Sequence, residues 1–167
     1  MKSDIKSKNL IAGEINKKIK KSGYESGFSE VGILAIDDLK ILNKLPQDYN
    51  DYLKANMYGG MTYLEKKLQY FHEPDKILPG VQSAIVVAMN YLSRDTKQDW
   101  QKIELTKLEN PDTGYVSIYA RGRDYHKVLK KNLKIFADKI STITGKFGHR
   151  ACVDSVPIFE IELAVLG

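Results

Sequence analysis

The sequence predicts a single α/β domain of the sandwich type, in which helices pack on a β-sheet. Segments with helical periodicity alternate with short runs rich in β-branched residues near positions 28, 83 and 149, and this alternation is typical of α/β proteins. The strongest helical pattern covers residues 123–141, and the strongest strand pattern covers residues 83–91. With 167 residues, the chain is long enough for one domain with a substantial core. The patterns leave the order and direction of the strands open.

The first third of the chain predicts a helix, a strand and an interrupted helix. Apolar residues recur at helical spacing over residues 9–21, and a Ser-Gly pair ends that pattern. Residues 28–36 are rich in β-branched side chains and predict the first strand. The Asp pair at 37–38 is a suitable cap for a helix that Pro46 interrupts, and a second helical piece follows.

The middle of the chain predicts a buried strand followed by a long loop. After a short helical pattern at residues 62–70, the run 83–91 is almost continuously apolar, as in a central strand that is buried on both faces. Residues 93–112 are polar and lack periodicity, which favours a long surface loop. Residues 115–120 then predict a short extended segment that leads into the helix at 123–141.

Four lysines lie on the side of the 123–141 helix that is opposite its apolar face: Lys127, Lys130, Lys131 and Lys134. Such a stripe is the ordinary pattern of a solvated helix face. It is also a suitable contact surface for a phosphate backbone, because each lysine adds salt-sensitive affinity without reading bases. The net charge of +5 favours an anionic partner such as nucleic acid.

The stretch from Cys152 to Pro157 is the strongest candidate for a chemical site. Alternation over residues 149–153 predicts a short strand, and Pro157 opens an apolar helical pattern, so that Asp154 and Ser155 lie at a strand-to-helix elbow. Ligands gather at the carboxyl ends of strands in such sheets. Both residues are also good N-caps. If Ser155 caps the helix, Asp154 is free for chemistry; if Asp154 caps it, amide donors occupy the carboxylate and make it a poor acid.

The composition excludes several classes of site. A single Cys excludes an internal disulfide and any metal or iron–sulfur site built from the cysteines of this chain. No apolar run approaches the length of a membrane span, and no signal-peptide core follows the N-terminus. We therefore expect a cytoplasmic protein.

Several separated stretches resemble the N-terminal half of the epoxyqueuosine reductases, a family of cobalamin-dependent iron–sulfur enzymes of tRNA queuosine synthesis. The Gly-Arg-Asp-Tyr-His and Val-Asp-Ser stretches are specific in this order and at this separation. The stretches that carry the resemblance are Leu78-Pro79-Gly80, residues 83–92, Gly114-Tyr115-Val116-Ser117, Gly122-Arg123-Asp124-Tyr125-His126 and Val153-Asp154-Ser155.

The resemblance implies a cofactor, a substrate and a set of site residues. Family members bind cobalamin in this domain and reduce the epoxide of epoxyqueuosine, within tRNA, to queuosine. Two [4Fe–4S] clusters, held by a ferredoxin-like region further along the chain, deliver the electrons. Asp154 matches the family's proton donor, a role that burial against the corrin would suit by favouring the protonated form. Ser117, Tyr119 and Ser155 match positions beside the corrin.

Two features depart from the family pattern. Ile118 stands where many members carry Arg, and the chain ends at Gly167, before the family's cluster-binding cysteines. We therefore expect residues 1–167 to be the cobalamin-binding N-terminal domain of a longer reductase, incomplete at the C-terminus and unable to turn over alone.

Two other functions compete with this interpretation. The basic helix face alone would suit a non-catalytic RNA-binding module. A flavin-dependent reductase is a weaker alternative, because the Gly-x-Gly-x-x-Gly turn that cradles a nucleotide phosphate is absent.

Overall fold

The computed structural model describes residues 2–41, 45–66, 69–70, 73–92, 96–154, 158 and 160–167. The described elements, in chain order, are α1 (Lys2–Tyr24), β1 (Glu30–Ala35), the 3₁₀ turn η1 (Ile36–Ile41), α2 (Leu45–Lys54), η2 (Thr62–Lys66), η3 (Pro74–Lys76), β2 (Ser83–Ala88), α4 (Trp100–Leu108), η4 (Ile118–Ala120), α5 (Tyr125–Thr144) and α6 (Glu160–Leu166). The predicted mixed α/β class is confirmed.

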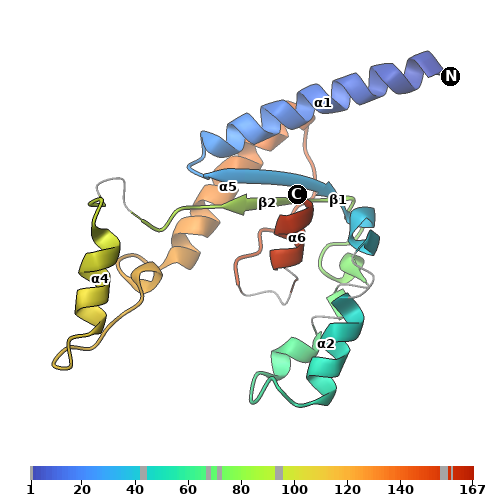
Figure 1. The fold of residues 1–167 in the computed structure, drawn as a ribbon. Coiled ribbons are helices and arrows are strands. Elements are labelled where there is room, and N and C mark those ends of the chain that lie inside the picture. Colours follow the sequence, from blue (N-terminus) through green and yellow to red (C-terminus); the bar gives the residue numbers. More distant parts are fainter. Residues whose placement is uncertain are drawn as a thin grey trace.

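The sheet is a two-stranded antiparallel pair of β1 and β2 (Figure 1). Its register places Val31 opposite Val87 and Ile33 opposite Ile85. All four side chains belong to, or pack against, one apolar cluster. Because side chains alternate between the two faces of a strand, this register gives the sheet one continuous β-branched face toward the helices.

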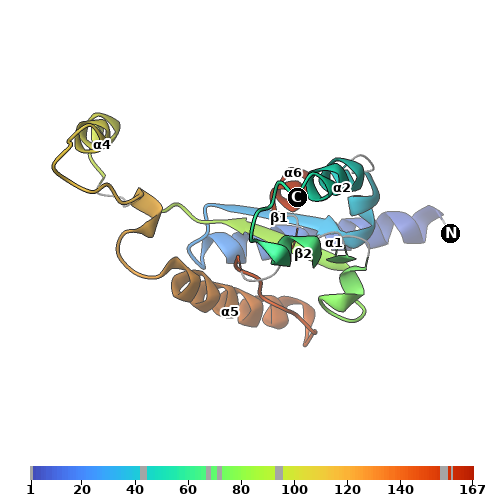
Figure 2. The ribbon, with the colours of Figure 1, turned by 90° about the horizontal axis from the view of Figure 1, so that it is seen from below.

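Helices α1 and α5 cover that face, and the hydrophobic core lies between them and the sheet (Figure 2). Ile19 of α1 and Phe136 and Ile140 of α5 are at most 7% exposed. The Phe136 ring lies 5.8 Å from that of Phe28, which precedes β1. Burial of such a side chain contributes about 1.5–3 kcal/mol relative to its exposure, so this cluster stabilises the domain.

The opposite face of the sheet carries α6, the second layer of helix in the sandwich. Gly167, which follows α6, lies against Gly32 of β1. A Cβ atom on Gly32 would be 2.6 Å from the carbonyl carbon of Gly167, too close for any side chain. Leu34, on the same face of β1 as Gly32, is 4% exposed. Glycine at position 32 is therefore what allows the chain after α6 to reach the strand.

The polar side chain of Asp124 caps the N-terminus of α5 by accepting a hydrogen bond from the backbone amide of His126. At the other end, Gly145 adopts φ of +87°, where residues with a side chain are disfavoured, and donates its amide to the Ser141 carbonyl. These two signals explain why the helix occupies nearly the residues that its periodicity predicts.

Helix α4 stands apart from the helix–sheet–helix layers in both views (Figures 1 and 2). It corrects the prediction of a structureless loop over residues 93–112, of which 93–95 lie outside the described part. None of its side chains is buried. Because no apolar stripe marks it, the periodicity that reveals a packed helix is missing from this segment.

Two strand predictions also need correction. Strand β2 is half-buried and has one partner within the described chain, so it is not a central strand buried on both faces. Residues 149–153 form no strand; Arg150 instead donates a hydrogen bond to the Ile77 carbonyl at 2.9 Å. Alternation predicted a strand there, but a strand also needs a partner for its backbone groups, and none of the described residues pairs with this segment.

Candidate active site

The carboxylate of Asp154 lies beside the first turn of α5. The Tyr125 hydroxyl donates a hydrogen bond to Asp154 Oδ2, and Nε2 of His126 lies 3.8 Å from the same oxygen. The Asp154 side chain is 50% exposed. It is therefore held from one side by the protein and open to solvent or a ligand on the other.

The backbone of Asp154 has a φ of +47°, in the left-handed region. Asp and Asn tolerate this region better than most residues, but it still carries a steric cost. A residue held in such a conformation often marks a functional position. Here the conformation occurs at the residue whose carboxylate contacts α5.

Asp124 holds the other side of the His126 ring. Its Oδ1 atom lies 3.0 Å from Nδ1 of His126 and also accepts the His126 backbone amide at 3.0 Å. The capping residue of α5 thus fixes both the helix start and the orientation of the imidazole. The side chains of His126 and Asp124 are 40% and 46% exposed.

Three aromatic rings form a row at this position. The Tyr125 ring stacks on the His126 ring, with 4.1 Å between their centroids, and meets the Tyr119 ring edge-on at 6.1 Å. Tyr119 is 57% exposed. The row therefore presents a partly exposed aromatic surface next to the Asp154 carboxylate.

The hydrogen bond to Asp154 raises the pKa of Tyr125 to about 12, assisted by partial desolvation and the nearby carboxylate charge. The phenol therefore remains a donor across the physiological range and is held by an acceptor that is negatively charged when ionised. Cys152 lies two residues before Asp154, and burial raises the pKa of its thiol, which disfavours the reactive thiolate.

The structure resolves the question of which residue caps the following helix as far as Asp154 is concerned. Helix α6 begins at Glu160, beyond Asp154. The Asp154 carboxylate accepts from a phenol instead of from helix amides. It is therefore not the cap of α6. Ser155 and Pro157 lie outside the described residues.

The other predicted site residues fall in different places. Tyr119 joins the Asp154 group through its ring contact with Tyr125. Ser117 is exposed before η4, and its side chain makes no capping hydrogen bond there. The roles of Tyr125 and Asp124 were not predicted, although both lie within the Gly-Arg-Asp-Tyr-His stretch that the sequence comparison singled out.

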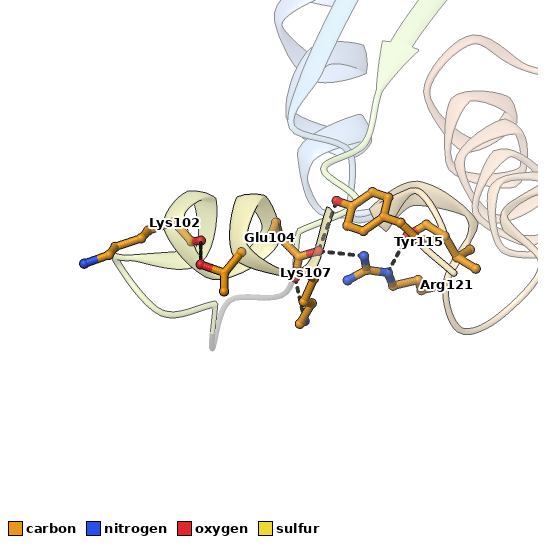
Figure 3. Close-up of polar contacts among 7 residues, drawn as sticks. Lys102, Glu104, Lys107, Tyr115 and Arg121 are labelled. Carbon is orange, nitrogen blue, oxygen red and sulfur yellow. Dashed lines mark hydrogen bonds and ion pairs between the residues drawn. The ribbon is translucent and has the colours of Figure 1, made fainter. Parts of the chain in front are cut away.

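A second carboxylate cluster joins α4 to the segment before α5 (Figure 3). Glu104 accepts hydrogen bonds from Arg121 at 2.6 Å, Lys107 at 2.8 Å and Tyr115 at 3.1 Å. Arg121 also donates to the Val116 carbonyl at 2.8 Å. These donors lower the pKa of Glu104 to about 2, with Arg121 the largest cause. We call these residues the Glu104 clasp.

The clasp lies beside an open groove of about 380 Å³. Its apolar lining comes from α4 and the following segment: Trp100, Leu105, Leu108, Tyr115 and Ile118. Because Ile118 lines the groove and the adjacent Tyr119 contacts Tyr125, the short turn η4 joins α4 to the Asp154 site.

The four lysines of α5 are all exposed, as predicted for either of their interpretations. Within the described part of the chain, no group of three or more His, Cys, Asp or Glu side chains is arranged to hold a metal ion. No helix among the described residues combines the length and apolar character that a bilayer-spanning helix requires.

Comparison with known proteins identifies the family. The sequence profile of the family described as "Epoxyqueuosine reductase QueG, DUF1730" matches residues 72–155, about half of the chain, a range that contains β2, α4, η4, α5 and Asp154. No solved structure gives a significant match.

Curated relatives extend the match to nearly the whole chain. The chain is 39% identical to the epoxyqueuosine reductase of Alicycliphilus denitrificans over 84% of its length, 34% identical to that of Burkholderia pseudomallei over 90%, and 35% identical to that of Escherichia coli over 95%. It spans only 38–39% of the length of these relatives. The chain belongs to the epoxyqueuosine reductase family and corresponds to part of its full-length members.

Proposed function

We propose that this chain is the cobalamin-binding N-terminal part of an epoxyqueuosine reductase and that Asp154 is its proton donor. The observation that carries the proposal is the placement of Asp154: its carboxylate is anchored at Oδ2 by Tyr125, is half-exposed, and borders an aromatic surface. A general acid needs such an anchored but accessible position.

The residues around Asp154 fit a broad, planar, polar-edged cofactor. Tyr119 offers an exposed ring, Ser117 an exposed hydroxyl, and Asp154 a carboxylate; Ser155, which lies outside the described residues, is a further candidate. None of these side chains has to ligate the metal. When bound, cobalamin supplies the electrons of the reduction through its cobalt. The site is open, so we expect a second surface to complete it.

The proton chemistry follows from the anchoring of the carboxylate. Conversion of an epoxide to an alkene with release of water consumes two electrons and two protons. Tyr125 occupies Oδ2, whereas none of the described residues hydrogen-bonds to Oδ1. We therefore assign Oδ1 as the atom that carries a proton to the epoxide oxygen, while Tyr125 fixes the orientation of the carboxyl group.

We place the two [4Fe–4S] clusters in the part of the full-length relatives that this chain does not span. Each such cluster needs several thiolates, and the chain has one Cys. The chain alone is therefore expected to bind cobalamin without completing the reaction. A tRNA-modifying role would place the protein in the cytoplasm.

A titration of the purified chain with cobalamin, followed by absorbance, tests the proposal. We expect a saturable spectral shift, both in the natural chain and in Asp154→Asn, because the variant keeps the ring and hydroxyl contacts. The absence of a shift in a chain that is folded by circular dichroism would contradict cobalamin binding. An unfolded chain would show instead that the domain requires the rest of the reductase.

A second candidate function rests on the lysine face of α5. Lys127, Lys130, Lys131 and Lys134 follow one another at i, i+3, i+4 and i+7 and are all exposed, which suits a tRNA backbone. Their replacement by Gln should weaken RNA binding and reduce its salt dependence by up to about 0.7 logarithmic units of slope per lost phosphate contact on a single strand. The matched control, Lys17→Gln with Lys21→Gln on α1, removes exposed charge elsewhere and should have less effect.

A further inference from the structure

We infer that His126 is a positioning residue that shares a proton with Asp154 and returns protons to it. The inference rests on a row of three side chains: Asp124, His126 and Asp154. Oδ1 of Asp124 lies 3.0 Å from one ring nitrogen, and Oδ2 of Asp154 lies 3.8 Å from the other. The imidazole therefore lies between two carboxylates at the start of α5.

Asp124 determines which ring nitrogen carries the hydrogen. An ionised carboxylate only accepts hydrogen bonds, so a contact of 3.0 Å with Oδ1 requires Nδ1 to be the donor. The hydrogen of a neutral ring is then on Nδ1, and the lone pair of Nε2 is directed to the Asp154 side. This is the usual way in which one hydrogen bond fixes the tautomer of a histidine.

This arrangement has room for one mobile proton between Nε2 and Oδ2. Either Asp154 is a carboxylic acid beside a neutral imidazole, or it is a carboxylate beside an imidazolium. The 3.8 Å separation is within ion-pair distance, and about 1 Å of side-chain movement brings it to hydrogen-bond length. Imidazole changes its charge between pH 5 and 8, where the carboxyl group alone would already be ionised.

The proton balance of the step is simple. After Asp154 has given its proton to a substrate, its carboxylate receives the proton on Nε2 of the imidazolium, and the ring becomes neutral. Water then reprotonates the ring, which is 40% exposed. No bond other than N–H and O–H forms or breaks, and no redox partner is required.

The other groups beside the row keep it in place. Tyr125 donates to Oδ2 of Asp154 and stacks on the His126 ring at 4.1 Å, so a single residue restrains both partners. Tyr119 and Lys127 are the remaining titratable neighbours, through their electrostatic effects on Tyr125 and on Asp124. The function of the proton on Asp154 rests on the proposed function, whereas the coupling between the two side chains does not.

Carbon-13 NMR of the aspartate carboxyl groups of the chain tests the coupling without cofactor or substrate. We expect the Asp154 Cγ signal to shift over the same pH interval as the His126 ring signals. In His126→Gln this component should disappear, while His149→Gln, which changes an exposed histidine beside Phe147, should retain it. A pH profile of Asp154 that is the same in His126→Gln and in the natural chain would overturn the inference.

A second variant separates the ring contact from the helix cap. Asp124→Ser keeps a capping hydroxyl but removes the carboxylate that orients Nδ1. The His126-linked component of the Asp154 signal should become smaller in this variant while the helix content remains. A full-sized component in Asp124→Ser would contradict the orienting role of Asp124.

Cobalamin titration of the same samples distinguishes the two proposals. Coupling without cobalamin binding would contradict the proposed function and leave the proton relation intact. Cobalamin binding without coupling would contradict the role of His126 alone.

Discussion

The body of the molecule and the α4 arm (residues 96–121) are stabilised by different kinds of interaction. The body encloses an apolar core between α1, α5 and the sheet, with Phe136 only 2% exposed. The arm buries no side chain of α4 and is joined through the Glu104 clasp. Apolar burial is insensitive to pH and salt concentration, whereas a charged cluster responds to both. We therefore expect the two regions to lose structure under different conditions.

The largest effect should follow from opening the core. Phe136→Ala is expected to lower the free energy of unfolding by about 3–5 kcal/mol, from lost burial and the resulting cavity. Urea denaturation followed by circular dichroism measures the change. Ile135→Ala is the matched control, because Ile135 neighbours Phe136 but is 41% exposed; its cost should stay below about 1 kcal/mol. Similar costs for the two variants would contradict the assignment of the core.

Loss of the clasp should release the arm and leave the body folded. Arg121→Gln removes the charge from the strongest contact of Glu104. Hydrogen exchange should then become faster at the amides of α4 and remain unchanged in the centre of α5. Lys102→Gln serves as the control, because Lys102 lies on the same helix and its ammonium group is not part of the clasp. Slow exchange in α4 of the Arg121 variant would show that other contacts hold the arm.

Acid should separate the two regions in the natural chain. The ordinary pKa of a glutamate is 4.5, and the clasp lowers the pKa of Glu104 to about 2. A lowered carboxyl pKa stabilises the folded state above the ordinary value, and this contribution is lost as the pH falls through 4.5 toward 2. Trp100 is the only tryptophan in the chain and lines the groove. Its fluorescence should therefore change in this interval, and in Arg121→Gln the change should move to higher pH.

The smallest effect concerns the Asp154 site. In Asp154→Asn, the pKa of Tyr125 should fall from about 12 toward its ordinary value of 10, because the charged acceptor is lost. In the natural chain the raised pKa stabilises the folded state below pH 10, and this contribution is lost as the pH rises toward 12. NMR of ring-labelled tyrosine measures the pKa. Glu104→Gln should leave it unchanged, and a shift of equal size there would indicate a general disturbance.

The same contrast explains how much of the molecule the sequence could predict. Helix α5 was predicted closely, because its apolar spacing and the cap at Asp124 are local signals. Helix α4 was missed, since it lacks an apolar stripe and its clasp depends on Arg121, 17 residues from Glu104. The supposed strand at 149–153 failed because alternation does not reveal whether a partner strand lies alongside.

The site could be predicted only in part for a similar reason. Asp154 was identified by its sequence motif, and Tyr119 by its position before α5. The partner of Asp154 could not be identified, because Tyr125 is 29 residues away and only the packing of the two segments brings them together. The cofactor contacts of Ser117, Tyr119, Asp154 and Ser155 remain predictions.

The left-handed backbone at Asp154 also limits which substitutions can be interpreted there. A residue such as Ala or Val would add about 1–2 kcal/mol of conformational strain, so a scan of all amino acids would report backbone tolerance together with chemistry. Asn tolerates the conformation, and Gly is free of its steric cost. A comparison of Asp154→Asn with Asp154→Gly therefore separates the two influences. An aspartate that recurs here in other sequences would be consistent with selection on the shape of the chain as well as on its acidity.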